Sequence, residues 1–167
     1  MRALTVRGYL ALLAVFVVLA AGLALAGQAV AQDRVVHHAI GVFDVAVEPA
    51  DPEIVEAGLG LSRYSLTKTF TGDLTGSSVG QMLAGGPDPE TGTYVALERI
   101  VGVLDGRAGA FLMAHRGDMS PDGYSLSITV VPNSGTGALT GLEGELLLTI
   151  TPDGVHHYDL AWTLPSS

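Results

Sequence analysis

The sequence predicts an all-β domain of eight antiparallel strands, and three observations favour this fold class. After residue 31, apolar and polar residues alternate with a period of two, which is the spacing of a half-buried strand. Glycine is abundant, at 22 of 167 residues, and clusters of Gly, Pro, Asp and Asn interrupt the alternation at short intervals. No stretch alternates strands with helices, so a parallel sheet is excluded.

Composition excludes several function classes. A chain of 167 residues holds one domain at most, and its lack of cysteine excludes a disulfide framework, a Cys-ligated metal and a thiol nucleophile. The net charge of −9 excludes nucleic acid and an anionic membrane surface as expected partners. Only 15% of the residues are charged, which is typical of a compact β protein and not of a coiled coil or a disordered chain.

The N-terminus has the pattern of a secretory signal. Arg2 and Arg7 precede an apolar run over residues 10–26, and Ala29-Val30-Ala31 forms a cleavage pattern. At ~1.5 Å per residue this run spans roughly 25 Å, which is short of the ~30 Å core of a bilayer. We therefore predict a cleaved signal over residues 1–31, with cleavage after Ala31. One β-barrel domain over residues 32–167 is then secreted to the periplasm, envelope or medium, with no membrane anchor.

Eight segments have strand patterns, and long strands with apolar residues on both faces favour closure. Open strands of this kind would leave hazardous edges, so a closed barrel is preferred to a sandwich. The predicted strands cover residues 35–47, 61–70, 73–83, 93–104, 107–116, 125–131, 145–151 and 155–164.

The segments between the strands carry turn signals. Asp105-Gly106 predicts a two-residue hairpin, because a type I′ turn needs positive φ at both positions. Residues 152–154 predict a second hairpin, and Gly72-Asp73 a third junction. Residues 85–92 are expected to form the longest loop, and residues 51–58 a short helical turn.

Four strings of sequence resemble a known family. They are KTFTGDLTGSS at 68–78, YVALERIVGVLDGRAGAFLMAHRG at 94–117, SLSITVVPNSGTGALTGLEGELLLTI at 125–150 and HHYDLAWTL at 156–164. They resemble a bacterial domain-of-unknown-function family of small β-barrels that are similar in fold to plant allene oxide cyclase. The resemblance covers nearly the whole predicted domain in order. It implies an eight-stranded antiparallel barrel and no activity, because the family itself lacks one.

Two candidate catalytic residues emerge from the hairpin register. A two-residue turn at Asp105-Gly106 places Glu98 opposite Met113 and diagonal to His115. A carboxylate and an imidazole in an apolar pocket have shifted pKa values and can pass a proton. A buried Glu also needs a partner, and His115 can simply supply one. Both interpretations stay open at this point.

The same hairpin face and the last strand supply candidate ligand-binding residues. Aromatic and apolar side chains surround the Glu98–His115 pair on the expected inner face, and the last strand adds two rings with polar tips. The candidate set is Tyr94, Glu98, Phe111, Met113, His115, Tyr158 and Trp162.

Other motifs are assigned no chemistry. Residues 76–80 match GxSxG, but a nucleophile elbow needs a helix after the Ser, and this match lies inside a strand. The pairs His37-His38 and His156-His157 point to opposite faces, so no metal site is predicted. No spacing implies a cofactor. Lys68 is the only lysine, against seven arginines, and we attribute this preference for arginine to genome composition.

The residues favour a secreted small β-barrel that binds a small apolar molecule in its interior. They leave open whether the protein is an enzyme. The alternatives are a cyclase or isomerase acting on an oxidised lipid or terpenoid, as the cyclase-like fold implies, and a purely structural envelope protein. Val95, Leu97 and Val101 make the opposite hairpin face apolar too, which suggests a homo-oligomer interface.

Overall fold

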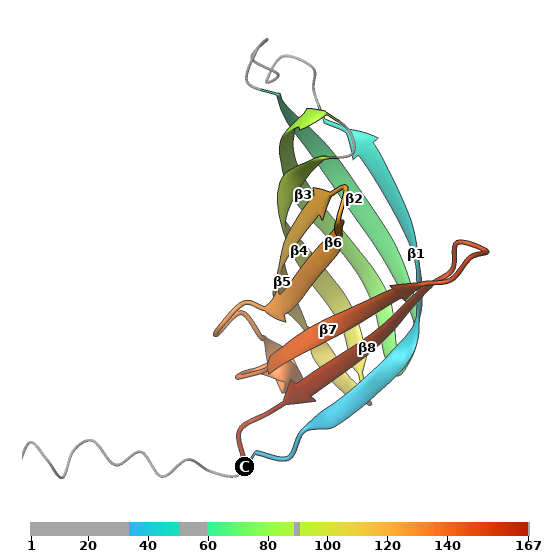
Figure 1. Cartoon of the computed structure of the whole chain (residues 1–167). Helices are drawn as coiled ribbons and strands as arrows, with labels where there is room; N and C mark the ends of the chain where they lie inside the picture. Colours follow the sequence, from blue (N-terminus) through green and yellow to red (C-terminus); the bar gives the residue numbers. More distant parts are fainter. Residues whose placement is uncertain (1–33, 51–59, 89–90, 167) are drawn as a thin grey trace, which may run out of the picture. The chain divides into compact units, whose positions relative to one another are not determined.

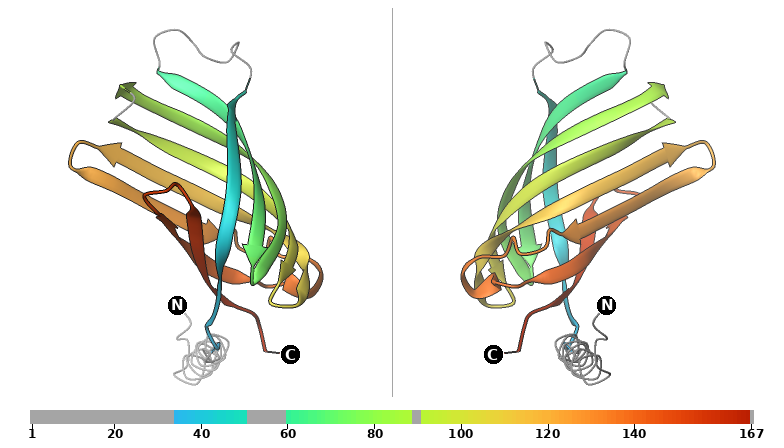
Figure 2. Two further views of the ribbon diagram at one scale, coloured as in Figure 1. Left: turned by 90° about the vertical axis from the view of Figure 1, so that its right-hand side faces the viewer. Right: turned by 90° about the vertical axis from the view of Figure 1, so that its left-hand side faces the viewer.

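The computed structural model describes residues 34–50, 60–88 and 91–166. Within them eight antiparallel strands close into a barrel in chain order, with β1 pairing both β2 and β8 (Figures 1 and 2). This confirms the predicted eight-stranded antiparallel barrel. The strands are β1 His37–Pro49, β2 Leu61–Gly72, β3 Leu74–Asp88, β4 Thr91–Leu104, β5 Arg107–Ser120, β6 Gly123–Val130, β7 Glu143–Ile150 and β8 His156–Thr163.

One predicted loop is wrong. Residues 85–92 were expected to leave the sheet, but β3 continues to Asp88 and β4 begins at Thr91, with a register shift between Gly85 and Asp88. A Cβ atom at Gly86 would lie 2.0 Å from the carbonyl oxygen of Thr91, so glycine lets the two backbones approach closely. The glycines therefore permit an irregular ladder instead of ending it.

Two other predicted segments lie outside the described residues. These are the signal at residues 1–31 and the helical turn at residues 51–58. Among the described residues, no helix is long and apolar enough to span a membrane.

The predicted turns are confirmed where the structure describes them. Asp105 and Gly106 both have positive φ, 48° and 79°, as a type I′ turn requires. The Gly154 amide closes the second hairpin by donating to the Thr151 carbonyl at 2.8 Å. The first of these turns fixes the β4–β5 register, which pairs Glu98 with Met113 and Ala96 with His115.

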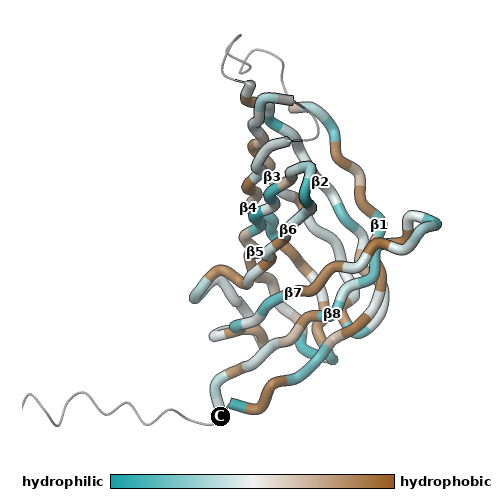
Figure 3. The backbone as a smooth tube through the Cα atoms, viewed as in Figure 1, coloured by the Kyte–Doolittle hydropathy of each residue, from teal (hydrophilic) through white to brown (hydrophobic). Residues whose placement is uncertain are grey.

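Large apolar side chains fill part of the barrel interior. The segment between β6 and β7 contributes the fully buried Leu139, on the 3-10 helix η2 (Gly137–Leu139), and Leu142. β6 pairs with β5 only from Met113 onward. Before that point the segment after β6 takes the place of β6, and the Thr136 amide donates to the Ala110 carbonyl at 2.8 Å. Apolar stretches recur along the strands that surround this core (Figure 3). Its largest fully buried side chains include Trp162, Phe111, Leu74, Ile100, Leu104 and Met113.

The barrel is joined weakly between β6 and β7. These two strands share a single register pair, Thr129 with Glu145, whereas β7 pairs with β8 along its whole length. Beyond that pair the two strands diverge (Figure 1). We call the interval between residues 123–128 of β6 and residues 146–150 of β7 the seam.

Candidate functional site

Glu98 lies at the centre of the site because of strand alternation. On β4 the side chains of Ala96, Glu98 and Ile100 are buried, while their neighbours Leu97 and Arg99 point outward and are exposed. The Glu98 side chain has no exposed surface. An ionised carboxylate in such a place must be paired and hydrogen-bonded.

Three neighbouring strands supply its partners. Lys68 from β2 donates from Nζ to Glu98 Oε2 at 2.8 Å, and Ser78 from β3 donates from its hydroxyl to Oε1. His115 Nε2 from β5 lies 2.8 Å from Oε2, at ion-pair distance but outside hydrogen-bond alignment, so we treat it as a close polar contact. These four residues form what we call the Glu98 cluster.

The cluster keeps Glu98 ionised. Burial by itself raises the pKa of Glu98, but the contacts with His115, Lys68 and Ser78 outweigh it and lower the pKa to about 2. A carboxyl group with this pKa is not a proton donor near neutral pH, and it is a weak general base. The geometry therefore gives Glu98 the role of holding its neighbours in position.

A cavity of about 200 Å³ lies inside the barrel next to the cluster. Every one of the eight strands contributes at least one residue to its wall. Lys68 and His115 provide polar groups, and the Lys68 Nζ atom lies 4.5 Å from the centre of the Phe43 ring. Most of the remaining wall is apolar and includes Val45, Leu66, Met82, Ala96, Ile128 and Leu148.

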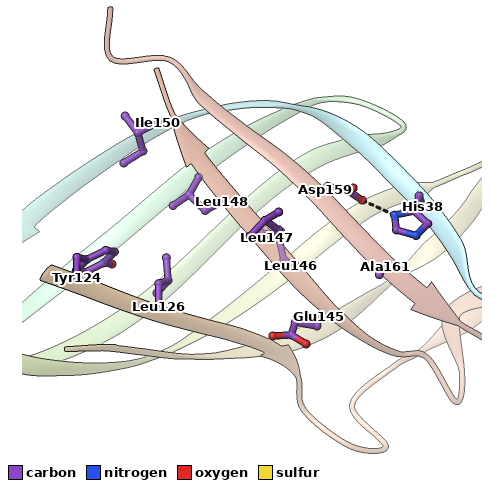
Figure 4. Close-up of a pocket in the computed structure, with 10 residues that line it drawn as sticks. All are labelled: His38, Tyr124, Leu126, Glu145, Leu146, Leu147, Leu148, Ile150, Asp159 and Ala161. Atoms are coloured by element: carbon purple, nitrogen blue, oxygen red, sulfur yellow. Dashed lines mark hydrogen bonds and ion pairs between the residues drawn. The ribbon is translucent and has the colours of Figure 1, made fainter. Parts of the chain in front are cut away.

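A second, larger groove of about 590 Å³ lies at the seam (Figure 4). In Figure 4, β6 and β7 lie close together near Glu145 and far apart at Tyr124 and Ile150. Four residues line both the groove and the inner cavity, so the two spaces adjoin. They are Tyr124, Leu126, Leu148 and Ile150.

Two tyrosines contact each other on the cavity wall, and one of them, Tyr124, also lines the groove. The hydroxyl groups of Tyr94 and Tyr124 lie 3.0 Å apart and share a hydrogen bond. Burial, followed by this contact with Tyr124, raises the pKa of Tyr94. The Tyr94 phenol is therefore a neutral donor or acceptor on the cavity wall beside the seam.

The structure brings three of the seven predicted site residues to this cavity. Tyr94 and His115 line it, and Glu98 lies directly behind His115, so the predicted Glu98–His115 contact is confirmed. The other four lie in the packed core, where the Tyr158 hydroxyl accepts a hydrogen bond from the Leu74 amide at 2.9 Å. These four are Phe111, Met113, Tyr158 and Trp162.

Sequence reasoning missed Lys68 and Ser78. Lys68 follows Leu66 and precedes Phe70 on the inward face of β2, and a lysine among inward apolar residues was the available signal. The attribution of the low lysine content to genome composition did not consider this placement. Ser78 lies within β3, as expected, and uses its hydroxyl to contact Glu98.

The site offers hydrogen-bond donors instead of a metal-binding set. Among residues 34–50, 60–88 and 91–166, no group of three or more His, Asp or Glu side chains is placed to hold a metal ion. The polar side chains on the cavity wall are Lys68, Tyr94, His115, Tyr124 and His156, and Lys68 and His115 are the two that belong to the Glu98 cluster.

Fold and site together define a small, closed, eight-stranded antiparallel barrel with a charged cluster buried in its wall. The chain belongs to the DUF3224 family, described as a protein of unknown function, whose family model matches residues 39–162. This confirms the resemblance to a bacterial domain-of-unknown-function family.

A solved structure from the same family is similar. It is the crystal structure of a DUF3224-family protein of unknown function from Shewanella oneidensis MR-1, which is 36% identical. The match covers 80% of this chain and 100% of that chain, with a TM-score of 0.72. No curated protein matches the chain.

Proposed function

We propose that this protein binds a small, mainly apolar molecule inside its barrel. The observation that carries the proposal is the cavity of about 200 Å³, walled by all eight strands and mostly by apolar side chains. Ligand sites typically combine such a lining with a few polar groups that fix orientation. Lys68 and His115 are groups of this kind.

The cavity volume limits the ligand. An apolar protein cavity of roughly 150 Å³ is large enough to bind benzene. A space of about 200 Å³ therefore suits one ring with a small substituent.

The seam supplies a route to the cavity. If the single β6–β7 register were continued, Leu126 would pair with Leu148 and Tyr124 with Ile150. These residues instead line the groove and the cavity together. Entry between β6 and β7 needs no rupture of a complete strand ladder.

Two measurements test the proposal. Native mass spectrometry of the chain, purified from its own host without refolding, should show a retained small molecule. Substituting Ala96→Leu adds side-chain volume at the cavity wall and should abolish retention, whereas Ala114→Leu adds the same volume on the outer face of β5 and should not. A protein that is empty in every preparation, and takes up no small apolar probe, would contradict the proposal.

A second candidate is a cyclase or isomerase acting on an oxidised lipid or terpenoid. The observation that favours it is the His115 ring, which lines the cavity while its Nε2 contacts an ionised carboxylate. Such a pair can orient an imidazole for proton transfer. A substrate of this class should be turned over by the wild type, while His115→Gln should bind it without turnover. Equal turnover by both proteins would refute this role.

The proposed location is outside the cytoplasm, on the strength of the N-terminal pattern ending at Ala31. The intact mass of the protein recovered from its own host should correspond to a chain that begins at Gln32. A mass that includes residues 1–31 would contradict secretion by cleavage.

A further inference from the structure

Lys68 has hydrogen-bonding capacity left over. Its side chain is 9% exposed and lines the cavity, and among the described residues its Nζ donates one hydrogen bond, to Glu98. An ammonium group carries three donors. One direction is taken by Glu98 and another faces the Phe43 ring, which leaves donor capacity toward the cavity.

The charges around Lys68 limit what can accept that hydrogen bond. Lys68 and Glu98 form a buried pair whose charges cancel. An anionic ligand would add a negative charge close to Glu98 inside the barrel, and uncompensated buried charge is strongly unfavourable. A neutral carbonyl oxygen accepts the same hydrogen bond without changing the net charge.

We infer that the ligand is a small apolar carbonyl compound whose oxygen accepts a hydrogen bond from Lys68 Nζ. This inference rests on the proposed function and names the ligand class. The carbonyl group lies at the Glu98 cluster, and the apolar body occupies the space toward Met82, Leu126 and Leu148.

Three probes of equal size test the ligand class. Acetophenone, cumene and benzoate share a phenyl ring and the same number of non-hydrogen atoms, and they end in a ketone, a hydrocarbon and an anion. Each is titrated against the full chain and its Lys68→Met variant.

Because a hydrogen bond from a charged donor is lost, the variant should bind acetophenone about tenfold more weakly. Its affinity for cumene should stay within about twofold, because a hydrocarbon accepts no hydrogen bond from Lys68. Benzoate should bind the wild type more weakly than acetophenone does.

A spectroscopic readout identifies the contact directly. The carbonyl carbon of ¹³C-labelled acetophenone should resonate further downfield when bound to the wild type than when bound to the Lys68→Met variant, because only the wild type donates a hydrogen bond to its oxygen from Lys68. Equal chemical shifts in the two bound states would contradict the contact. If that variant does not fold, because Glu98 has lost its counter-charge, the double variant Lys68→Met/Glu98→Gln removes both charges and permits the same comparison.

The outcomes separate this inference from the proposed function. If neither cumene nor acetophenone binds the wild type, the proposed function fails, and the inference fails with it. If cumene binds, and the affinity for acetophenone is the same in the wild type and in Lys68→Met, only the inference is overturned. Tightest binding by benzoate, lost in Lys68→Met, would also overturn it, because the ligand would then be an anion.

Discussion

At the scale of single residues, Glu98 is a fully buried carboxylate that three side chains hold in place. Its side chain has no exposed surface, yet its pKa is lowered to about 2, so it carries a charge at neutral pH. Breaking a buried ion pair by removing one partner typically costs about 3–5 kcal/mol, because the other charge is left uncompensated. Lys68 and His115 are thus structural partners of Glu98 as well as candidate ligand contacts, whereas Ser78 is a structural partner alone.

The Glu98 carboxylate should make stability depend on pH in the acid range. A group whose folded pKa lies below its ordinary value of 4.5 stabilises the fold above that value, and the effect is lost as the pH falls through about 2. The wild type should therefore lose up to about 3 kcal/mol of unfolding free energy from this group between neutral pH and pH 2.

Urea unfolding of the wild type and of Glu98→Gln across this pH range measures the effect. The variant should be less stable at neutral pH and should show a flatter acid dependence. Glu143→Gln is the control, because Glu143 forms an exposed pair with Arg34 and such pairs contribute little. Equal acid slopes for wild type and Glu98→Gln would show that Glu98 is not the group responsible.

At the scale of elements, the β4–β5 hairpin determines that His115 meets Glu98. A register slip by one residue would turn every side chain of a strand to the opposite face. The type I′ turn at Asp105-Gly106 excludes that slip and places His115 one diagonal step from Glu98. The turn is therefore part of the site even though it lies at the far end of the hairpin.

Replacing Gly106 should test how strongly this turn is specified. Gly106 has a φ of 79°, and a Cβ atom added there would meet no other atom within 4 Å, so the cost of Gly106→Ala is backbone strain alone. We expect a loss of about 1 kcal/mol in unfolding free energy. Gly106→Asn should cost less, because Asn tolerates the left-handed region. Thermal or urea unfolding that ranks Asn below Ala would argue against the type I′ geometry.

At the scale of the whole molecule, the barrel is unevenly closed. β4 is paired along both edges, whereas β7 meets β6 at a single register pair. Backbone groups on the seam side of β7 therefore lack strand partners among the described residues. The seam is the part of the barrel where opening should be easiest.

Hydrogen exchange should reveal this difference. Amides of β7 residues 146–150 that point toward the seam should exchange at least about tenfold faster than amides in the middle of β4. Peptide-level or residue-level exchange at neutral pH measures the ratio. Equal protection would show that the β6–β7 ladder closes in solution, and it would remove the proposed route to the cavity.

The outer wall carries a second property of the whole molecule. The predicted second apolar face is present, since Val95, Leu97 and Val101 point outward, and Leu97 is 57% exposed. Such surface is a common mark of an interface. A homo-oligomer through this face stays a prediction.

The sequence by itself determined the features that depend on neighbouring residues. Period-two alternation located the eight strands, and the turn residues Asp105-Gly106 were sufficient to predict that the side chains of Glu98 and His115 are neighbours. The loop expected at residues 85–92 failed because glycine both breaks strands and permits close strand contact, and only the neighbouring backbone decides between the two. Local pattern therefore predicted the elements well and their irregularities poorly.

Only the tertiary structure decided what surrounds Glu98 and how the barrel closes. Lys68 and Ser78 reach Glu98 from β2 and β3, and their positions depend on registers set by two further strand pairs. The cavity and the seam depend on all eight strands at once, because each lining residue is placed by closure of the sheet. A site assembled across many strands has no local signature, since its contacts join residues that are far apart in the chain.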